Sequence, residues 1–353
     1  MPQCKHPLAR FLRIVGRAWS FVLKHLPGEH FILNSTDQVP MALKNMHEHF
    51  QTAVPNAELA TAVLDIEGCF PSMPKAVSRL AMRDLLRDAL AAETPAVRRQ
   101  ATISVPRRSR KDPCRWGTTT DPAYVNLPVG TMVEALDFVL DNTLMRMPDG
   151  QLMRQVGGIP MGDPISPANA IGTTAWMELE WMRSLDQESK RHFRAKRYVD
   201  DILVIYNTNA EWRGADFIRD FKESTCYMAP LRLEPGAPDV FLETKLEKVA
   251  RGEFTYRLKN TNEDGVQRVW RYTPASSYTP YSQKVGLIAG LTQKCIRMTS
   301  DTEQLRISRK AKVAELRQLG YSGRIIRAGI YAVSRQKFAD EYINAAHDVG
   351  LDA

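Results

Sequence analysis

The sequence predicts an α+β fold in which an antiparallel sheet packs on helices and a helical region follows. Two apolar segments rich in β-forming residues, 60–66 and 198–206, carry aspartates where a strand ends or turns. Further strand signals continue to residue 272, whereas 273–353 has helical spacing and no strand signal. These observations predict a sheet-containing body and a separate helical C-terminal module.

The composition of the chain indicates its size class, the charge of its partner and its cellular setting. The 353 residues are 44% hydrophobic, enough for one large domain or two to three subdomains. The net charge of +8 favours a polyanionic partner without identifying it. The five cysteines form no Cys-x-x-Cys pair, which argues against a disulfide framework or a structural zinc site and indicates a reducing, intracellular setting. No apolar run approaches the roughly 18 to 20 residues of a membrane span. We therefore expect a soluble protein of the nucleus or cytoplasm with no membrane partner.

The N-terminal region is predicted to be helical and basic. An amphipathic helix runs from Leu8 to Leu26, where Pro27-Gly28 ends it. Three interpretations stay open: a helix packed on the body with its basic side towards nucleic acid, a transit peptide, or a membrane-surface helix. The first is favoured because no Ser-rich continuation follows. A second helix is predicted over 35–50.

The segment 60–74 is predicted to be a buried strand that ends at Asp65, followed by a tight turn that carries Phe70. Pro74 suits the first turn of a helix that extends to about Glu93. An aspartate at the end of an apolar strand is a candidate metal ligand once a second carboxylate strand exists to meet it.

Two loops of different character follow. The stretch 98–115 is basic, contains prolines and has few core residues, so we expect a loop that is either a solvated connection or a template or primer contact. A helix is predicted over 131–145. The loop 157–167 holds three glycines, which let the backbone approach a ligand closely, and it leads into a helix over 168–185 whose free N–H groups suit an anion or a base.

The adjacent carboxylates Asp200 and Asp201 lie at the tip of a predicted hairpin. Neighbouring negative charges near a core are costly unless protons or cations neutralise them, and hard divalent cations prefer oxygen ligands. The alternative interpretation is a hairpin whose turn uses aspartate twice.

The remaining chain is predicted to hold a β meander and then helices. Its strands are expected over 240–249, 254–259 and 267–272. A capping box at 300–303 opens a helix that Gly320 ends, and another helix follows. Basic side chains of these helices are expected to face outward: Arg306, Arg309, Lys310, Lys312, Arg317, Arg324 and Arg327.

Asp65 and the Asp200-Asp201 pair are neighbours if their strands share one sheet. Such a site can hold two magnesium ions about 4 Å apart, one activating an attacking oxygen and the other stabilising the departing pyrophosphate. Phosphoryl transfer requires little more than this positioning and charge neutralisation.

Three segments together resemble reverse transcriptases. The segment around Asp65 resembles motif A, the loop 158–167 resembles motif B, and Tyr198-Val199-Asp200-Asp201 resembles the Y-x-D-D box of motif C, in the same order and with similar spacing. The resemblance implies catalytic carboxylates at Asp65, Asp200 and Asp201. It implies a metal site of Asp65, Ile66, Asp200 and Asp201 for two Mg²⁺ ions, with Mn²⁺ as an alternative.

Other stretches are similar to the Penelope-like, telomerase-related branch: 70–74, Met161-Gly162, 240–243 and 281–321. The implied layout is a basic helical region over 1–50, a right-hand polymerase palm with reduced or atypical fingers over 51–272, and a helical thumb over 273–353. It further implies nucleotide-binding residues and a primer grip. The nucleotide-binding residues are Phe70, Gly162, Ser166 and Pro167, and the primer grip comprises Phe241, Leu242 and Glu243.

Phe70 bears on substrate choice. It lies five residues after Asp65, where reverse transcriptases have an aromatic steric gate that occupies the space of a ribose 2′-OH. A buried core phenylalanine is the alternative. The resemblance thus implies an RNA-directed DNA polymerase, of the kind found in retroelements, that uses an RNA template, a DNA or RNA primer and dNTPs. Any nicking would fall to a separate endonuclease or host protein.

Two features depart from the family pattern. Only 64 residues precede Asp65, which leaves little room for the usual fingers, and Asp163 is unusual within motif B of this branch. Two rival functions therefore stay open. One is a viral-type RNA-dependent RNA polymerase, and the other is a non-catalytic RNA-binding derivative of a reverse transcriptase.

Overall fold

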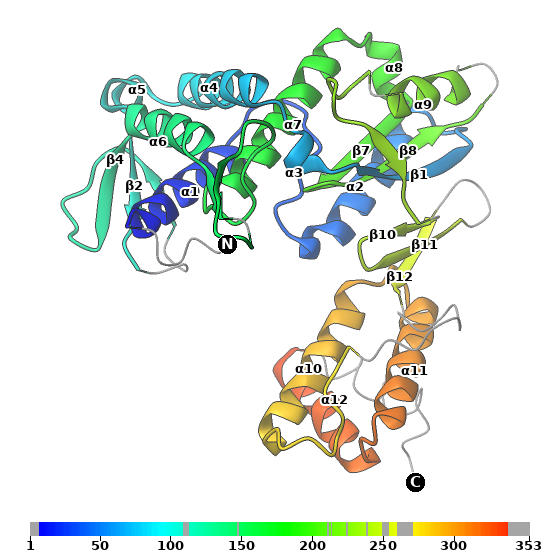
Figure 1. Ribbon diagram of the computed structural model, residues 1–353. Coiled ribbons are helices and arrows are strands. Elements are labelled where there is room, and N and C mark those ends of the chain that lie inside the picture. Colours follow the sequence, from blue (N-terminus) through cyan, green and yellow to red (C-terminus); the bar gives the residue numbers. More distant parts are fainter. Residues whose placement is uncertain are drawn as a thin grey trace. The chain divides into compact units, whose positions relative to one another are not determined.

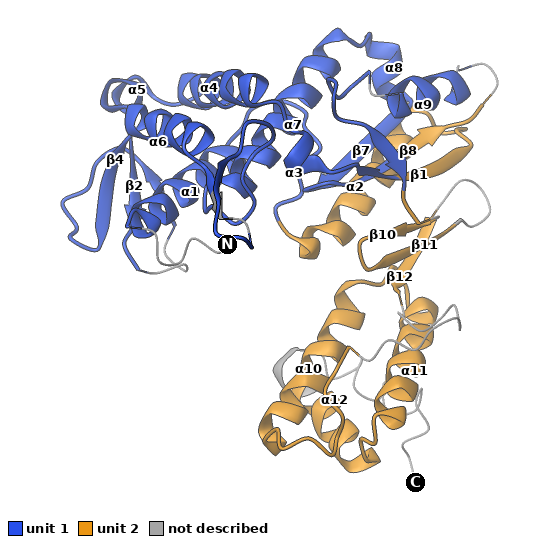
Figure 2. Ribbon diagram, in the orientation of Figure 1, with its two compact units in different colours: residues 1–34, 64–204, 210–235 blue, residues 35–63, 205–209, 236–353 orange. Residues whose placement is uncertain are grey.

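The chain folds into two compact units, coloured separately in Figure 2. The first comprises residues 1–34, 64–204 and 210–235, and the second comprises 35–63, 205–209 and 236–353. The structure is a computed structural model, and it describes residues 7–108, 113–146, 148–209, 212, 214–223, 225–237, 239–248, 254–259 and 271–337. The predicted three-part division at residues 50 and 272 stays a prediction.

A four-stranded sheet holds the two aspartate segments as neighbouring strands (Figure 1). Its order is β7 (Phe193–Tyr198), β8 (Asp201–Asn207), β1 (Leu59–Ile66) and β9 (Leu233–Pro235). β1 and β9 are antiparallel, with Asp65 opposite Glu234. Four consecutive residues of β8, 202–205, are buried, which explains why this strand reads as an unbroken apolar run. The predicted mixture of helix and sheet is confirmed.

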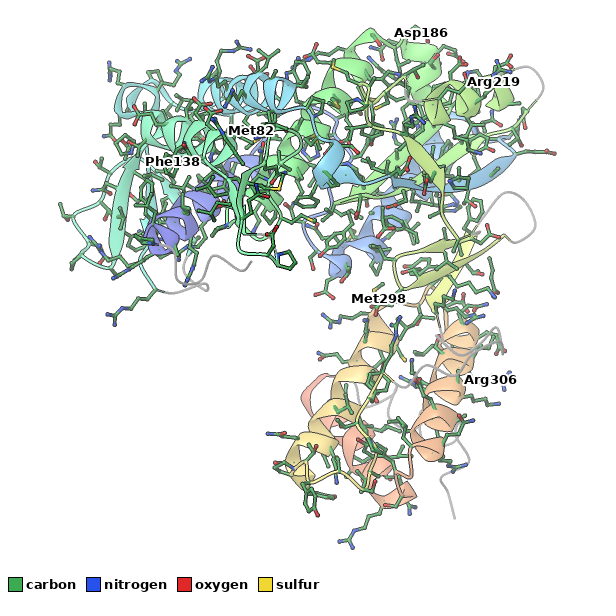
Figure 3. The ribbon with its side chains drawn as sticks, in the orientation of Figure 1. Met82, Phe138, Asp186, Arg219, Met298 and Arg306 are labelled. Atoms are coloured by element: carbon green, nitrogen blue, oxygen red, sulfur yellow. The ribbon has the colours of Figure 1, made fainter. Side chains whose placement is uncertain are left out.

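Helices pack closely around α7 (Ser166–Ser184) in the first unit. Its neighbours are α1 (Ala9–Lys24) and α4 (Lys75–Ala91), and α6 (Val129–Asp141) packs on both α1 and α4. Two glycines allow the close approach: a Cβ added at Gly16 would lie 2.3 Å from the Pro164 carbonyl oxygen, and one at Gly172 would lie 2.4 Å from the sulfur of Met82, labelled in Figure 3. The apolar side of α1 is buried, so this helix is packed on the body, as the favoured interpretation of the N-terminal region requires.

The predicted loop over 98–115 is wrong. Helix α5 (Pro95–Gln100) leads into a three-stranded sheet of order β3 (Arg115–Trp116), β2 (Thr102–Pro106) and β4 (Tyr124–Pro128). Every residue of β2 is buried, so β2 is a core strand of five residues. It was not predicted because the segments on both sides of it are rich in arginine. The rest of the first unit comprises α3 (Cys69–Ser72), the hairpin β5 (Leu144–Arg146) and β6 (Leu152–Arg154), α8 (Gln187–Arg191) and α9 (Gly214–Lys222).

The second unit contains a small antiparallel sheet and a group of helices. The sheet has the order β10 (Val240–Phe241), β11 (Thr244–Lys248) and β12 (Phe254–Leu258). The helical elements are η2 (Thr36–Gln38), α2 (Val39–Ala53), α10 (Tyr281–Arg297), α11 (Thr302–Gln318) and α12 (Gly323–Lys337). Of the strand predicted over 267–272, only the last two residues are described, and they are not in a strand.

The core formed by α10, α11 and α12 corrects one prediction about charge. Arg309 and Lys312 of α11 are 6% and 7% exposed, although their spacing predicts an outward orientation. The Lys312 ammonium lies 2.8 Å from the Glu315 carboxylate and 5.5 Å from the centre of the Tyr272 ring, and these partners compensate its burial. Within the described residues, no helix is both long enough and apolar enough to cross a membrane.

A candidate active site of three aspartates

Two backbone segments bring the predicted carboxylates together in the first unit. Asp65 lies at the end of β1, and Val199 and Asp200 form the two-residue turn between β7 and β8. The Ile66 N–H donates a hydrogen bond of 3.2 Å to the Asp200 carbonyl, which fixes the turn beside the end of β1. The side chains of Asp65, Asp200 and Asp201 are all half-buried, whereas that of Ile66 is buried.

The carboxylates interact as like charges. Burial, together with the neighbouring Asp200 carboxylate, raises the pKa of Asp65. Burial, then the charges of Asp200 and Asp65, raises the pKa of Asp201 to about 6. None of the three forms an ion pair with a described residue. The site is therefore a concentration of negative charge that the described protein groups leave without a counter-charge.

The site is not a preformed chelate. Among the described residues, no group of three or more His, Cys, Asp or Glu side chains is arranged so that it could hold a metal ion. The donor set nevertheless consists of hard oxygen atoms without a counter-charge, and this is the chemistry that Mg²⁺ and Mn²⁺ select.

The loop resembling motif B is docked on the turn that carries Phe70. That segment, predicted to be a tight turn, is the short helix α3, and the Phe70 carbonyl accepts a hydrogen bond of 2.8 Å from the Ile159 N–H. Gly158 has φ +67°, and a Cβ added there would lie 2.4 Å from the Pro71 carbonyl oxygen. The Lys75 ammonium donates a bond of 2.6 Å to the Gln155 carbonyl just before this loop. The Phe70 side chain is half-buried, so it is not an ordinary core residue.

The other residues predicted to bind nucleotide differ in exposure. Gly162 is exposed with φ +93°, and Pro167 is exposed at the start of α7. Ser166 is 1% exposed, and its hydroxyl has no hydrogen-bond partner among the described residues. Asp163 has a structural role that its sequence context did not reveal: its carboxylate accepts a bond of 2.8 Å from the Ile165 N–H and so helps to form the turn that opens α7.

The residues predicted to form a primer grip belong to the second unit. Phe241 is buried in β10, and Leu242 occupies the turn before β11 with φ +56°. Glu243 forms ion pairs with Lys294 of α10 and, at 3.3 Å, with Arg271. This turn is thus attached to α10 by charge.

Two further residues support the site through contacts that the sequence does not predict. Gly158 is expected only as one of three glycines that let the backbone approach a ligand, whereas the contact that requires glycine there comes from α3. Arg197 lies on the buried face of β7 directly before the turn. Phe193, Ala195 and Arg197 alternate along β7 and therefore lie on the same, buried face of the strand. An arginine at a core position needs a buried partner, so this alternation is the feature of the sequence that could have identified Arg197.

Comparisons with known proteins bear on the fold. No protein-family model matches the chain, and no curated protein matches its sequence. Among solved structures, telomerase from Candida tropicalis in complex with a TWJ fragment of telomeric RNA matches with a TM-score of 0.54 at 12% identity, covering 99% of this chain and 50% of that chain. The corresponding Candida albicans complex matches with a TM-score of 0.55 at 11% identity, covering 96% and 53%.

The chain spans about half the length of those telomerase chains. A Sicinivirus RNA-dependent RNA polymerase gives a TM-score of 0.41 at 12% identity, covering 90% of this chain and 55% of the viral one. The two telomerase matches indicate a similarity of fold alone, because their sequence identity is low. They show that this chain has a fold similar to that of the telomerase chains.

Proposed function

We propose that this chain is an RNA-directed DNA polymerase, which extends a primer on an RNA template by nucleotidyl transfer from dNTPs. The observation that carries the proposal is that neighbouring strand ends bring the backbones of Asp65, Asp200 and Asp201 side by side, while their carboxylates repel one another and have no counter-charge among the described residues. A structural role would favour neutral or oppositely charged side chains at this place. The similarity of fold to the telomerase chains is the second support.

Divalent cations complete the proposed site. Asp65 and Asp200 would be the principal ligands, with Asp201 as the third carboxylate and the backbone of Ile66 beside them. Two bound Mg²⁺ ions supply charge neutralisation for the attacking primer oxygen and for the departing pyrophosphate. The protein's own task is to hold these carboxylates ionised and oriented while the primer 3′ oxygen bonds to the α-phosphorus and the bond to pyrophosphate breaks.

The sugar and the template are assigned from separate observations. Phe70 is half-buried and its carbonyl is bonded to the loop 157–167, which supports a fixed ring that excludes a 2′-OH. The net charge of +8 suits a nucleic acid partner. The telomerase complexes with similar folds contain a TWJ fragment of telomeric RNA, which supports an RNA partner here, and we propose that this partner is the template. In this assignment 51–272 is the palm, 273–353 is the thumb, and 241–243 is the primer grip.

Primer extension tests the proposal. Wild-type protein on poly(rA)/oligo(dT) with Mg²⁺ and dTTP is expected to extend the primer, and Asp65→Ala is expected to lose about 10³-fold or more, because several kcal/mol of charge stabilisation disappear. Extension with ribonucleotides alone would instead identify an RNA-dependent RNA polymerase. RNA binding without extension under Mg²⁺ or Mn²⁺, equal in wild type and Asp65→Ala, would refute catalysis and identify an RNA-binding protein.

A further inference from the structure

A buried ion pair lies directly behind the aspartate turn. Arg197 of β7 and Glu178 of α7 are both 0% exposed, and the Arg197 Nε donates to Glu178 Oε1. The same carboxylate accepts a bond of 3.0 Å from the Tyr227 hydroxyl and one of 3.1 Å from the Phe31 N–H. Glu178 is therefore held by three donors from three different segments of the first unit.

The other two nitrogens of the guanidinium each donate to a backbone carbonyl. Arg197 Nη1 donates a bond of 2.6 Å to the Val199 carbonyl, within the turn itself, and Nη2 donates one of 3.3 Å to the Ile171 carbonyl of α7. The Arg197 backbone is also held, because its N–H donates to the Phe31 carbonyl at 2.6 Å and its carbonyl accepts from the Leu33 N–H at 2.7 Å. The guanidinium thus joins α7 to the turn from a fixed backbone position.

Stability alone does not explain this arrangement. A buried ion pair replaced by apolar residues of similar volume is often neutral or stabilising, so its presence calls for another reason. The rigid, forked guanidinium bonds a carboxylate and two carbonyls through three separate nitrogens, whereas a lysine ammonium would have to reach all three acceptors from one nitrogen and an apolar side chain has no donor.

The turn itself supplies that reason. Val199 has φ +60°, a conformation that a β-branched residue adopts only under constraint from its surroundings. The bond from Arg197 Nη1 to the Val199 carbonyl is such a constraint.

We propose that Arg197, oriented by Glu178, is a positioning residue that holds Val199 in its left-handed conformation and thereby fixes Asp200 beside Asp65. Because Glu178 belongs to α7, which begins at the loop 157–167, the pair also ties the turn to the segment assigned to nucleotide binding. The catalytic consequence rests on the proposed function, whereas the positioning of the turn does not.

A double-mutant cycle with a matched control tests the proposal. Arg197→Lys keeps the charge opposite Glu178 but loses the fork, and Arg194→Lys makes the same change on the same strand, where the side chain bonds the carbonyls of Lys190 and Phe193 instead of the turn. Val199→Gly removes the strain, since glycine adopts positive φ without cost. Far-ultraviolet circular dichroism and thermal unfolding of all variants establish that each is folded.

The first readout is amide hydrogen exchange of residues 198–203 in the metal-free full chain. Arg197→Lys is expected to accelerate exchange there by on the order of tenfold, with exchange in α10 unchanged, and Arg194→Lys is expected to leave the turn as in wild type. In the Val199→Gly background, Arg197→Lys should change exchange at the turn much less. Glu178→Gln, which keeps the shape of the side chain, supplies the same comparison if Arg197→Lys does not fold.

The second readout is primer extension. Arg197→Lys is expected to lower kcat about tenfold or more with the KM for dNTP little changed, and the loss should shrink in the Val199→Gly background. Equal exchange at the turn in Arg197→Lys and Arg194→Lys, or strictly additive effects of the Arg197 and Val199 changes, would overturn the positioning role. If wild-type protein extends no primer, the proposed function fails while the exchange readout still decides the positioning.

Discussion

The half-buried Asp201 is expected to make the stability of the metal-free protein depend on pH. Its pKa is about 6 instead of 3.8, so between those values the native state binds more protons than the unfolded state. The free energy of unfolding should therefore fall as the pH rises from about 4 to about 6, and the raised pKa of Asp65 acts in the same direction.

Asp201→Asn should consequently stabilise the protein at pH 7 in EDTA and give a smaller loss of stability between pH 4 and 7 than wild type. Urea unfolding at several pH values measures this difference. In wild type at pH 7, added Mg²⁺ should raise the unfolding free energy by mass action, and the gain should be smaller in Asp201→Asn. Identical pH profiles for the two proteins would contradict a shared electrostatic site.

Gly158 is expected to control both stability and sugar selection. An alanine there would be strained at φ +67° and would place its Cβ 2.4 Å from the Pro71 carbonyl oxygen. We expect Gly158→Ala to lose at least about 1–2 kcal/mol of stability from the left-handed conformation alone. The added Cβ would force α3, which carries Phe70, to move. The preference of the enzyme for dNTPs over NTPs should therefore weaken, as we also expect for Phe70→Ala.

Gly157→Ala is the matched control, since nothing lies within 4 Å of a Cβ at that position and its φ is not left-handed. Unfolding by urea and incorporation of dTTP against UTP measure the two effects. Equal stability and equal sugar selection in the Gly157 and Gly158 variants would show that the contact of the loop with Pro71 affects neither property.

At the level of elements, the packing of α1 is expected to depend on the close approach of Gly16 to the backbone of Pro164. A Cβ at Gly16 would lie 2.3 Å from the Pro164 backbone oxygen, and a backbone atom inside a packed loop cannot yield as a side chain end can. We expect Gly16→Ala to lower stability by about 1–3 kcal/mol, the usual effect of overpacking. Gly130→Ala, in α6 with nothing within 4 Å of the added Cβ, should be neutral or slightly stabilising, and chemical denaturation of both proteins decides.

Local patterns were sufficient for the elements that carry the candidate site. The apolar run of β8, the strand that ends at Asp65 and the amphipathic α1 are all encoded by neighbouring residues, and each was predicted within a few positions. The strand β2 was missed because it has five residues and lies between charged flanks, so composition outweighed the alternation of Ile103 and Val105.

Features that depend on distant partners could not be predicted from local sequence. The burial of Lys312 also requires Tyr272, which is far away in the sequence, and the contact that demands glycine at 158 comes from Pro71. The same holds for Arg197, whose partner Glu178 is 19 residues away in the sequence and belongs to another element. No periodic pattern records such a pairing, because only the tertiary fold brings the two groups together.

For the whole molecule, charge is the property most directly connected with a nucleic acid partner. Exposed basic side chains occur in both units, so the excess charge of +8 is not confined to one of them. Among them are Arg10, Arg13, Arg107 and Arg154 of the first unit and Lys310, Arg317 and Arg324 of the second. A duplex held by such groups is bound through its phosphates, which releases counterions and makes the affinity depend on salt but little on sequence.

We therefore expect the affinity for an RNA–DNA hybrid to fall by more than about tenfold between 50 and 200 mM NaCl, with a linear dependence of log K on log salt, because several phosphate contacts are lost together. Fluorescence anisotropy with a labelled hybrid, in EDTA to prevent turnover, measures it. Lys310→Ala should reduce the slope by about one if that residue contacts a phosphate. Asp65→Asn should retain the wild-type slope, since it removes a carboxylate and no basic contact. An affinity that is independent of salt would exclude phosphate contacts as the basis of binding and, with them, the role proposed for the basic surfaces of both units.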